Sequence, residues 1–247
     1  MRNFKLTIEY DGVNFCGWQI QHKGERTVQG ELVKACGIIF KQEVKVIASG
    51  RTDSGVHAKG QVVSIKADTR MKSLDIQKAL NSRLPLDISI LAVKEVDNGF
   101  HAQYSVKEKT YRYTILNAKV RSAFLRDHAY FYPYDLDVKL MRQGARAIKG
   151  RHDFKSFQAY DPLRKDRDTV RTIKRLTVKQ EGDLIFIDLT ANGFLYKMVR
   201  NIVGVLLAIG AQKIPSNSVA AILKAKNRDA AKNTAPAQGL CLMTVKY

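Results

Sequence analysis

Apolar and polar residues alternate over Phe4–Tyr10, which predicts a strand at the start of the chain. Between Val28 and Phe40 the apolar residues recur at helical spacing instead, and Thr27 is placed to cap that helix. Further predicted elements of the first half are strands at Val44–Ala48, Gln61–Ile65 and Ile88–Val96, and a helix at Ser73–Asn81 capped by Ser73. This β-α-β-β-α-β order is that of the ferredoxin-like fold.

The second half repeats this pattern with additions. A helix at Val138–Lys149 has Asp137 as its cap and Gly150 just past its end, and a second helix, Leu195–Ile209, is ended by Gly210. The other predicted elements are strands at Thr110–Leu116, Ala129–Tyr132, Asp168–Lys179, Leu184–Thr190 and Leu240–Tyr247, and a short helix at Ser218–Lys224. We therefore expect an α+β protein of two ferredoxin- or RRM-like units, residues 1–105 and 106–247, whose antiparallel sheets face a central basic cleft.

The charge of the chain indicates a polyanionic partner. Its 247 residues include 42 Lys and Arg against 23 Asp and Glu, a net charge of +19, and residues 106–247 hold 27 of those basic residues. No apolar run approaches the roughly 20 residues that span a bilayer. The N-terminus lacks a signal pattern. Nucleic acid is therefore favoured over a membrane, and a cytoplasmic location is expected.

The densest basic stretch is Lys149–Arg175, which includes Arg164 and Lys165 in a predicted loop. A solvated charge run explains that loop as well as an RNA contact does. The three cysteines and five histidines show no ligand spacing, so no metal site is expected. Cys36 falls on the apolar side of its helix and is predicted to be a core residue.

Candidate chemistry gathers in the loop Gly50–Ala58, with the sequence G-R-T-D-S-G-V-H-A, between two predicted strands. It combines the Asp53 carboxylate, the Arg51 guanidinium and the His57 imidazole. Its glycines allow another molecule to approach the backbone closely. Loops on a rigid sheet often carry catalytic groups, although Asp in such a turn often only bonds its own backbone.

Two further segments offer functional groups. Arg200 and Lys197 lie on the polar face of the predicted helix Leu195–Ile209, and a partly buried Arg needs an acidic partner. That partner is any nearby carboxylate, such as Asp188, if the pair is structural and Asp53 if it is functional. Tyr111 and Tyr113 share one face of a strand, where a ring either supports a nucleobase or joins a core pair. Trp18 likewise either stacks on RNA or caps the core.

The loop Gly50–Ala58 resembles the G-R-T-D-x-G-V-H-A signature of the TruA-type tRNA pseudouridine synthases. The resemblance covers nearly the whole chain, in the family's order. Its further blocks are Tyr10-Asp11-Gly12 through Gln21, Phe100-His101-Ala102, Tyr111-Arg112-Tyr113, Gly150 through Phe157, Phe194 through Gly204, and Ala235 through Leu240. Ser54 stands where Ala is frequent, and Gln103 where Arg is frequent; neither position is one we expect to be catalytic.

The resemblance implies a homodimeric isomerase that forms pseudouridine in the tRNA anticodon stem-loop, at nucleotide positions 38, 39 and 40, without a cofactor. It assigns the nucleophile to Asp53, a uracil-stacking and proton-accepting role to Tyr111, and pairing with the catalytic carboxylate to Arg200. We expect substrate or RNA contacts from Arg51, His57, Tyr111, Arg164, Lys165 and Lys197. The alternatives are a non-catalytic RNA-binding protein with two RRM-like units, and a metal-dependent nuclease, which needs an acidic cluster.

Overall fold

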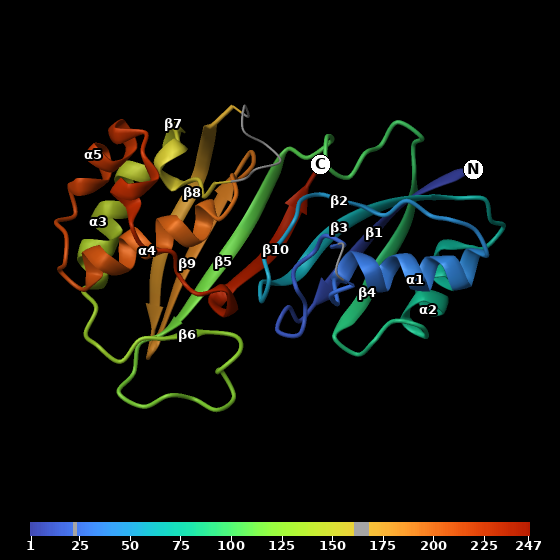
Figure 1. Cartoon of the computed structure of the whole chain (residues 1–247), viewed down its shortest axis with the longest axis horizontal. Coiled ribbons are helices and arrows are strands. Elements are labelled where there is room, and N and C mark those ends of the chain that lie inside the picture. The colour runs from blue at the N-terminus through green and yellow to red at the C-terminus, as the bar shows by residue number, and fades with distance from the viewer. Residues whose placement is uncertain (22–23, 161–167) are drawn as a thin grey trace. The chain divides into compact units, whose positions relative to one another are not determined.

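A computed structural model describes residues 1–21, 24–160 and 168–247, and Figure 1 shows its helices and strands. Arg164 and Lys165 lie outside the described residues. The chain forms two compact units, Met1–Lys107 with Cys241–Tyr247, and Glu108–Leu240. Both units combine helices with strands, which confirms the predicted α+β class. None of the helices among the described residues is long and apolar enough to cross a membrane.

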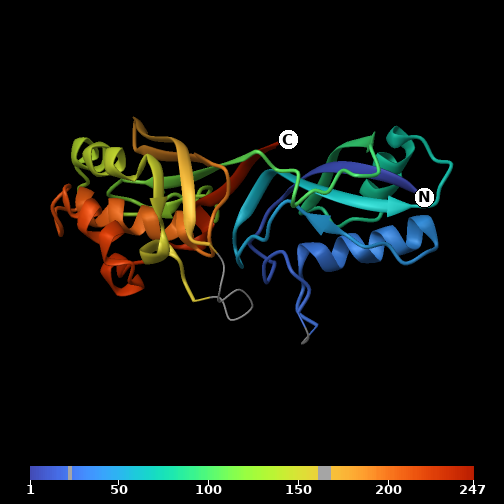
Figure 2. The ribbon, with the colours of Figure 1, turned by 90° about the horizontal axis from the view of Figure 1, so that it is seen from above.

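The first unit is a sheet in the order β4-β1-β3-β10, with β2 paired to β3. Strand β1 runs antiparallel to both β3 and β4, so the ferredoxin-like strand arrangement is confirmed here. Helix α1 runs beside these strands in both Figure 1 and Figure 2. The elements are β1 (Arg2–Tyr10), α1 (Val28–Phe40), β2 (Ile47–Ala48), β3 (His57–Ala67), α2 (Ser73–Asn81), β4 (Ile88–Val96) and β10 (Leu240–Lys246).

The spacing of apolar side chains and the residues that cap the helices explain these elements. Phe4, Leu6 and Ile8 are fully buried on one face of β1, as the alternation predicts. Thr27 caps α1, because its hydroxyl accepts a hydrogen bond from the Gly30 amide. The predicted cap of α2 is wrong: Ser73 is already helical, and Lys72 in the capping position makes no side-chain bond to the helix.

Two predicted strands are shorter in the structure. Only Ile47–Ala48 of the first and Tyr130–Phe131 of the second pair with a neighbouring strand. Val44 and Val46 are nevertheless buried. Their alternation therefore reports burial of one face rather than hydrogen bonding to a sheet, and a pattern of side chains cannot distinguish the two.

The last strand belongs to the first unit. Cys241 and Leu242 of β10 pair in parallel with His57 and Ala58 of β3. The Tyr247 hydroxyl donates to the Ala102 carbonyl oxygen, 2.8 Å away. The compact units therefore differ from the expected ranges 1–105 and 106–247, because β10 belongs to the first unit. Its hydrogen-bonding partners lie far earlier in the sequence.

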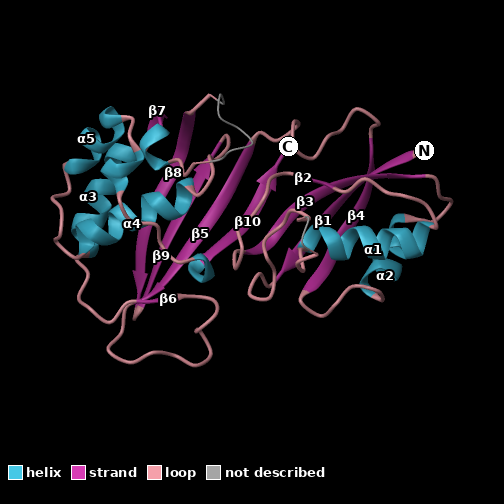
Figure 3. Cartoon of the chain, in the orientation of Figure 1, coloured by secondary structure: helices cyan, strands magenta, loops and turns pink. Residues whose placement is uncertain are grey.

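The second unit is an antiparallel sheet in the order β5-β9-β8-β7, with β6 parallel to β5. Its helices are coloured cyan beside the magenta strands in Figure 3. Helix α3 packs against β8, α4 and α5. The elements are β5 (Glu108–Leu116), β6 (Tyr130–Phe131), α3 (Val138–Ile148), β7 (Gly150–Asp153), β8 (Val170–Glu181), β9 (Leu184–Ala191), α4 (Met198–Gly210) and α5 (Ser218–Ala225), with short 3-10 turns at Lys155–Phe157, Arg228–Ala231 and Ala237–Gly239.

Helix α3 begins at its predicted cap, since an Asp137 carboxylate oxygen accepts from the Lys139 and Leu140 amides. Helix α4 begins three residues later than expected. Lys197 adopts a left-handed conformation with a φ of 56°, so the helix starts only at Met198. Strand β7 was not predicted, because four residues with polar side chains at three positions show no apolar alternation.

Candidate active site

The signature segment divides between a loop and a strand. Residues Gly50–Val56 form the loop, whereas His57 and Ala58 already belong to β3. Arg51 is exposed, Asp53 is half-buried, and Thr52 between them is buried. The Val56 amide donates to the Asp53 carbonyl oxygen at 3.2 Å, which closes a tight turn around Asp53. The loop thus presents one exposed and one half-buried charged side chain from a backbone that is internally hydrogen-bonded.

A second loop of the same unit, residues 11–18, holds this backbone in place. The Trp18 amide donates to the Thr52 carbonyl oxygen at 3.1 Å. The Ser54 hydroxyl and the Gly55 amide both donate to the Phe15 carbonyl oxygen, at 3.2 and 3.4 Å. Ser54, the departure from the family pattern, therefore makes a backbone contact between the two loops.

Trp18 is a core residue. Its side chain is 2% exposed, and its ring lies 6.3 Å from the ring of Tyr10. Of the two roles that the sequence left open, capping the core is the one that the structure supports, because a buried ring offers no face to a nucleobase. The polar-aromatic sequence of this loop serves to build a platform under the Asp53 loop.

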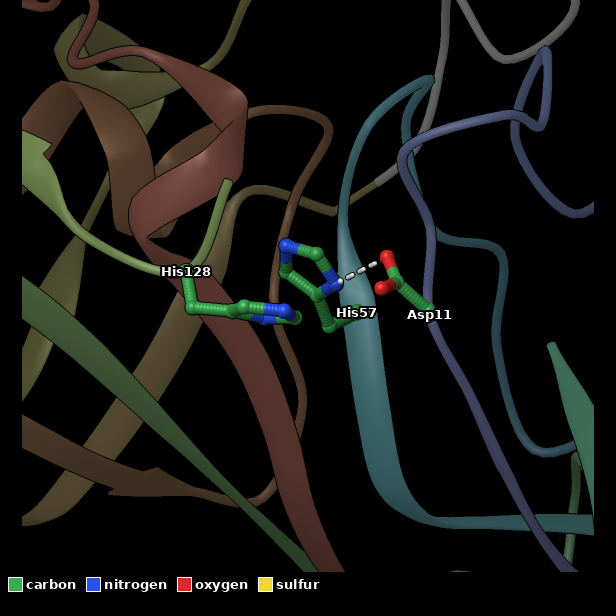
Figure 4. A group of neighbouring side chains, drawn as sticks. All are labelled: Asp11, His57 and His128. Atoms are coloured by element: carbon green, nitrogen blue, oxygen red, sulfur yellow. Dashed lines mark ion pairs between the residues drawn. The ribbon is translucent and has the colours of Figure 1, made fainter. Parts of the chain in front are cut away.

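His57 is 6% exposed and lies beneath the loops, at the start of β3. Its Nδ1 lies 3.1 Å from the Gly12 amide nitrogen and 3.1 Å from Asp11 Oδ1. Figure 4 shows the Asp11 carboxylate directed at the His57 ring. A neutral ring accepts the Gly12 N–H at this nitrogen, and a protonated ring donates to Asp11. His57 therefore anchors the first loop, and its predicted RNA contact stays a prediction.

The aromatic strand β5 supplies the candidate groups of the second unit. Tyr111 and Tyr113 lie on its buried face, and the Tyr111 ring meets Phe194 edge-on at 5.2 Å. The Tyr113 hydroxyl donates to the Pro236 carbonyl oxygen, and burial raises the pKa of this side chain. The predicted shared face is confirmed. Tyr113 is fully buried, whereas Tyr111 keeps 8% of its surface exposed.

Arg112 points to the other face of the strand, where it meets Asp188 of β9. Its Nε and Nη2 atoms donate to the two carboxylate oxygens of Asp188, at 2.7 and 2.9 Å. This bidentate geometry occupies the carboxylate that the sequence offered as a structural partner of Arg200. The sequence pattern does not reveal the Arg112–Asp188 pair, because only strand register brings these residues opposite one another.

Arg200 lies in the first turn of α4 and is half-buried. Its Nε donates to the Ala235 carbonyl oxygen at 2.7 Å, and the Ala235 amide donates back to the Arg200 carbonyl oxygen at 3.0 Å. The neighbouring Asn201 is fully buried and donates to the Phe157 carbonyl oxygen. The position of Arg200 is therefore set by segments that lie more than thirty residues from it along the chain, on either side.

Lys197, immediately before α4, is half-buried, and its Nζ lies 5.2 Å from the centre of the Tyr196 ring. Part of the basic stretch Lys149–Arg175 has a structural role. Arg171 is 8% exposed and donates to the Asp168 and Val170 carbonyl oxygens.

Cys36 is buried as predicted, and burial raises the pKa of its thiol to about 12.

A family model described as tRNA pseudouridine synthase matches residues 6–105 and 145–247. Several bacterial proteins named tRNA pseudouridine synthase A align over almost all of the chain. The protein of Thermoanaerobacter sp. (strain X514) is 43% identical over 247 residues, covering 100% of both chains. That of Geobacillus sp. (strain WCH70) is 45% identical, covering 100% of this chain and 98% of its own length. That of Halalkalibacterium halodurans is 46% identical over 244 residues, 97% of this chain and 90% of its own.

The first matched range contains the Asp53 loop and its supporting loop, and the second contains Arg200 with the segment that holds it. With matches that extend over both units, the chain belongs to the tRNA pseudouridine synthase family.

Proposed function

We propose that this chain isomerises uridine to pseudouridine in the tRNA anticodon stem-loop, at nucleotide positions 38, 39 and 40, with Asp53 as the nucleophile. The observation that carries the proposal is the family match across both units, together with a half-buried carboxylate on a loop whose backbone is bonded to a second loop. Such a loop presents its carboxylate in one direction, as a covalent step requires.

The reaction breaks the bond between uracil N1 and ribose C1′ and forms a bond between C5 and C1′. Asp53 bonds covalently to the nucleotide while the base turns, and the carboxylate leaves when the C–C bond is complete. The proton on C5 is lost, and N1 gains one. Because no atom is oxidised and no group is lost, residues of the chain suffice for the chemistry and no cofactor is implied.

Tyr111 is proposed to stack under the uracil and to accept the C5 proton. Its ring is fixed by the edge-on contact with Phe194, and its surface is not completely buried. Tyr111→Phe keeps the ring and removes the hydroxyl. It should lower kcat and leave KM unchanged, whereas Tyr111→Ala should also raise KM, because the stacking surface is lost.

Arg200 is proposed to pair with Asp53 in the working enzyme and to keep the carboxylate ionised. Arg200→Ala should lower activity and, through loss of the bond to Ala235, stability. Arg200→Lys keeps the charge without the planar fork, and it should keep part of the activity. Normal turnover by Arg200→Ala would refute the pairing.

The tRNA partner is proposed to contact Arg51, His57, Lys197, Arg164 and Lys165, with the net charge of +19 supplying the attraction. The target uridine must leave its stack before a carboxylate reaches it, which costs a few kcal/mol. Phosphate contacts offset that cost. We also infer a homodimer, which sedimentation of the purified chain tests directly.

The decisive experiment uses tRNA that carries tritium at uracil C5. The wild type should release the label to water, and Asp53→Asn, which keeps the shape of the side chain, should release none while still binding tRNA. Asp68→Asn is the matched control, because Asp68 is an exposed carboxylate of the same unit outside the loop. Binding by the wild type without release would instead identify a non-catalytic RNA-binding protein.

A further inference from the structure

A group of buried polar side chains lies directly behind the Asp53 loop, and the reaction described above makes no use of it. We call Tyr10, Ser49, Thr52 and Gln61 the loop network. All four are buried, with exposed fractions of 4%, 1%, 7% and 0%. Buried polar groups are costly unless they are hydrogen-bonded, so a cluster of this kind within a small unit calls for a physical reason.

The network is closely bonded. The hydroxyls of Tyr10 and Thr52 lie 2.8 Å apart. Gln61 donates through Nε2 to the Gly50 carbonyl oxygen at 2.9 Å, and its Oε1 accepts from the Ser49 hydroxyl at 2.6 Å and from the Val62 amide at 3.1 Å. Burial raises the pKa of Tyr10, although hydrogen bonds to Thr52 and Gln61 oppose that effect. Tyr10 therefore stays a neutral hydroxyl.

The strands explain why these groups meet. Gln61 lies opposite Ile8 in the β1–β3 register, and Tyr10 follows two residues later on the same face of β1. The register shifts between Ile8 and Tyr10, an irregularity of the kind that re-aims side chains next to functional sites. Two neighbouring strands of a rigid sheet thus direct an amide and a phenol toward the base of one loop.

The hydrogen bonds of the network hold the chain before Arg51 and again between Arg51 and Asp53. Ser49 and Gly50 are held before Arg51, and Thr52 is held between Arg51 and Asp53. The backbone at both ends of this segment is fixed as well, because the Ser49 amide donates to the Val62 carbonyl oxygen at 2.7 Å and the Thr52 carbonyl oxygen accepts from Trp18. Asp53 therefore has little freedom to move with its own backbone.

We propose that Tyr10, Thr52 and Gln61 are positioning residues that fix the direction of the Asp53 carboxylate for attack. The inference rests on the proposed function of Asp53. The network acts through hydrogen bonds that limit the backbone of residues 49–53. Because misplacement by about 1 Å can cost about a hundredfold in rate, loss of one hydrogen bond here should affect turnover more than binding.

The key variant is Thr52→Val, which keeps the shape of the side chain and removes the hydroxyl. We expect the single-turnover rate of tritium release at saturating tRNA to fall about 10- to 100-fold, with the Kd for tRNA within about twofold of wild type. Amide hydrogen exchange at residues 50–56 should become faster. Thr52→Ser restores the hydroxyl and should recover most of the rate.

Ser64→Ala is the matched control for stability. Ser64 is also buried on β3, and its hydroxyl accepts from the Ala102 amide at 3.2 Å, away from the loop. This control should lower the thermal unfolding temperature without changing the rate or the exchange of the loop. The double variant Tyr10→Phe with Thr52→Val removes both hydroxyls. It should regain the stability that Thr52→Val alone loses, but it should not regain turnover.

A Thr52→Val protein with wild-type turnover and wild-type exchange would overturn the inference. So would an equal loss of rate in Ser64→Ala, which would attribute the effect to stability alone. If the wild type itself releases no label, the proposed function fails. In that case unchanged exchange in Thr52→Val overturns the holding of the loop by the network, and faster exchange supports that holding.

Discussion

At the scale of single residues, space between two backbones determines the geometry of the Asp53 loop. A Cβ atom added at Gly12 would lie 2.2 Å from the Val56 carbonyl oxygen. At Gly17 it would lie 2.8 Å from the Thr52 carbonyl oxygen, and the φ of 86° there disfavours any other residue. Both contacts join the loop of residues 11–18 to the Asp53 loop, so glycine is required for the two loops to approach.

Gly12→Ala should therefore destabilise the protein by about 2–3 kcal/mol, because main-chain atoms on both sides must move. Urea unfolding measures this loss, and tritium release should fall with it as the Asp53 loop is displaced. Gly37→Ala is the control, since nothing lies within 4 Å of an added Cβ in this helical position. It should stabilise the protein by about 0.5–1 kcal/mol. Equal effects of the two substitutions would contradict the steric argument.

At the scale of elements, a single carboxylate joins several pieces of the second unit. Asp153 ends β7 and accepts from the Lys155 amide at 3.1 Å and from the Thr169 hydroxyl at 2.5 Å, just before β8. Lys226, directly after α5, lies 3.1 Å from its other oxygen. Burial raises the pKa of Asp153, but the hydrogen bonds from Thr169, Lys226 and Lys155 outweigh it and leave the pKa below its usual value.

A lowered folded-state pKa means that this carboxylate stabilises the fold above the unfolded-state pKa, near 3.9, and that the contribution is lost as the pH falls through the folded-state value. Asp153→Asn should therefore be less stable than wild type by about 1 kcal/mol at neutral pH. The difference should shrink as the pH falls below the unfolded-state pKa and through the lower folded-state pKa. Urea unfolding across this range measures it, and Thr169→Val should remove part of the same pH dependence. A difference that does not shrink as the pH falls below the unfolded-state pKa would contradict this assignment.

At the scale of the whole molecule, charge is the dominant feature. A net charge of +19 on 247 residues exceeds what pairing within the chain can balance, since basic residues outnumber acidic ones by 42 to 23. Even some residues in the basic stretch, such as Arg171, are committed to the fold. The remaining exposed cations provide the attraction for a polyanion, and their effect depends on counterion release.

Binding to tRNA should weaken by about a hundredfold or more between about 50 and 200 mM salt. Arg51→Gln should reduce the slope of log Kd against log salt by about one, because one phosphate contact is lost. Lys78→Gln, an exposed substitution on α2, serves as its control and should leave the slope unchanged. A flat response of the wild type would exclude a large phosphate footprint.

The sequence by itself determined the local elements and the candidate chemistry. The observed β1 and α1 closely match the period of two over Phe4–Tyr10 and the helical period over Val28–Phe40. Thr27 is also the helix cap that the sequence predicts. These features depend on residues adjacent in the chain, where side-chain period and hydrogen bonding to nearby amides dominate. The motif of the Asp53 loop can be recognised in the sequence for the same reason, because its residues are contiguous.

Tertiary structure alone decided the rest. It placed β10 with β3, buried Trp18 and His57, and paired Asp188 with Arg112. It also brought Tyr10, Thr52 and Gln61 together behind Asp53. Each of these outcomes joins residues that are far apart along the chain. Local pattern carries no information on which distant strand supplies a partner, because register and burial arise only when the sheets form.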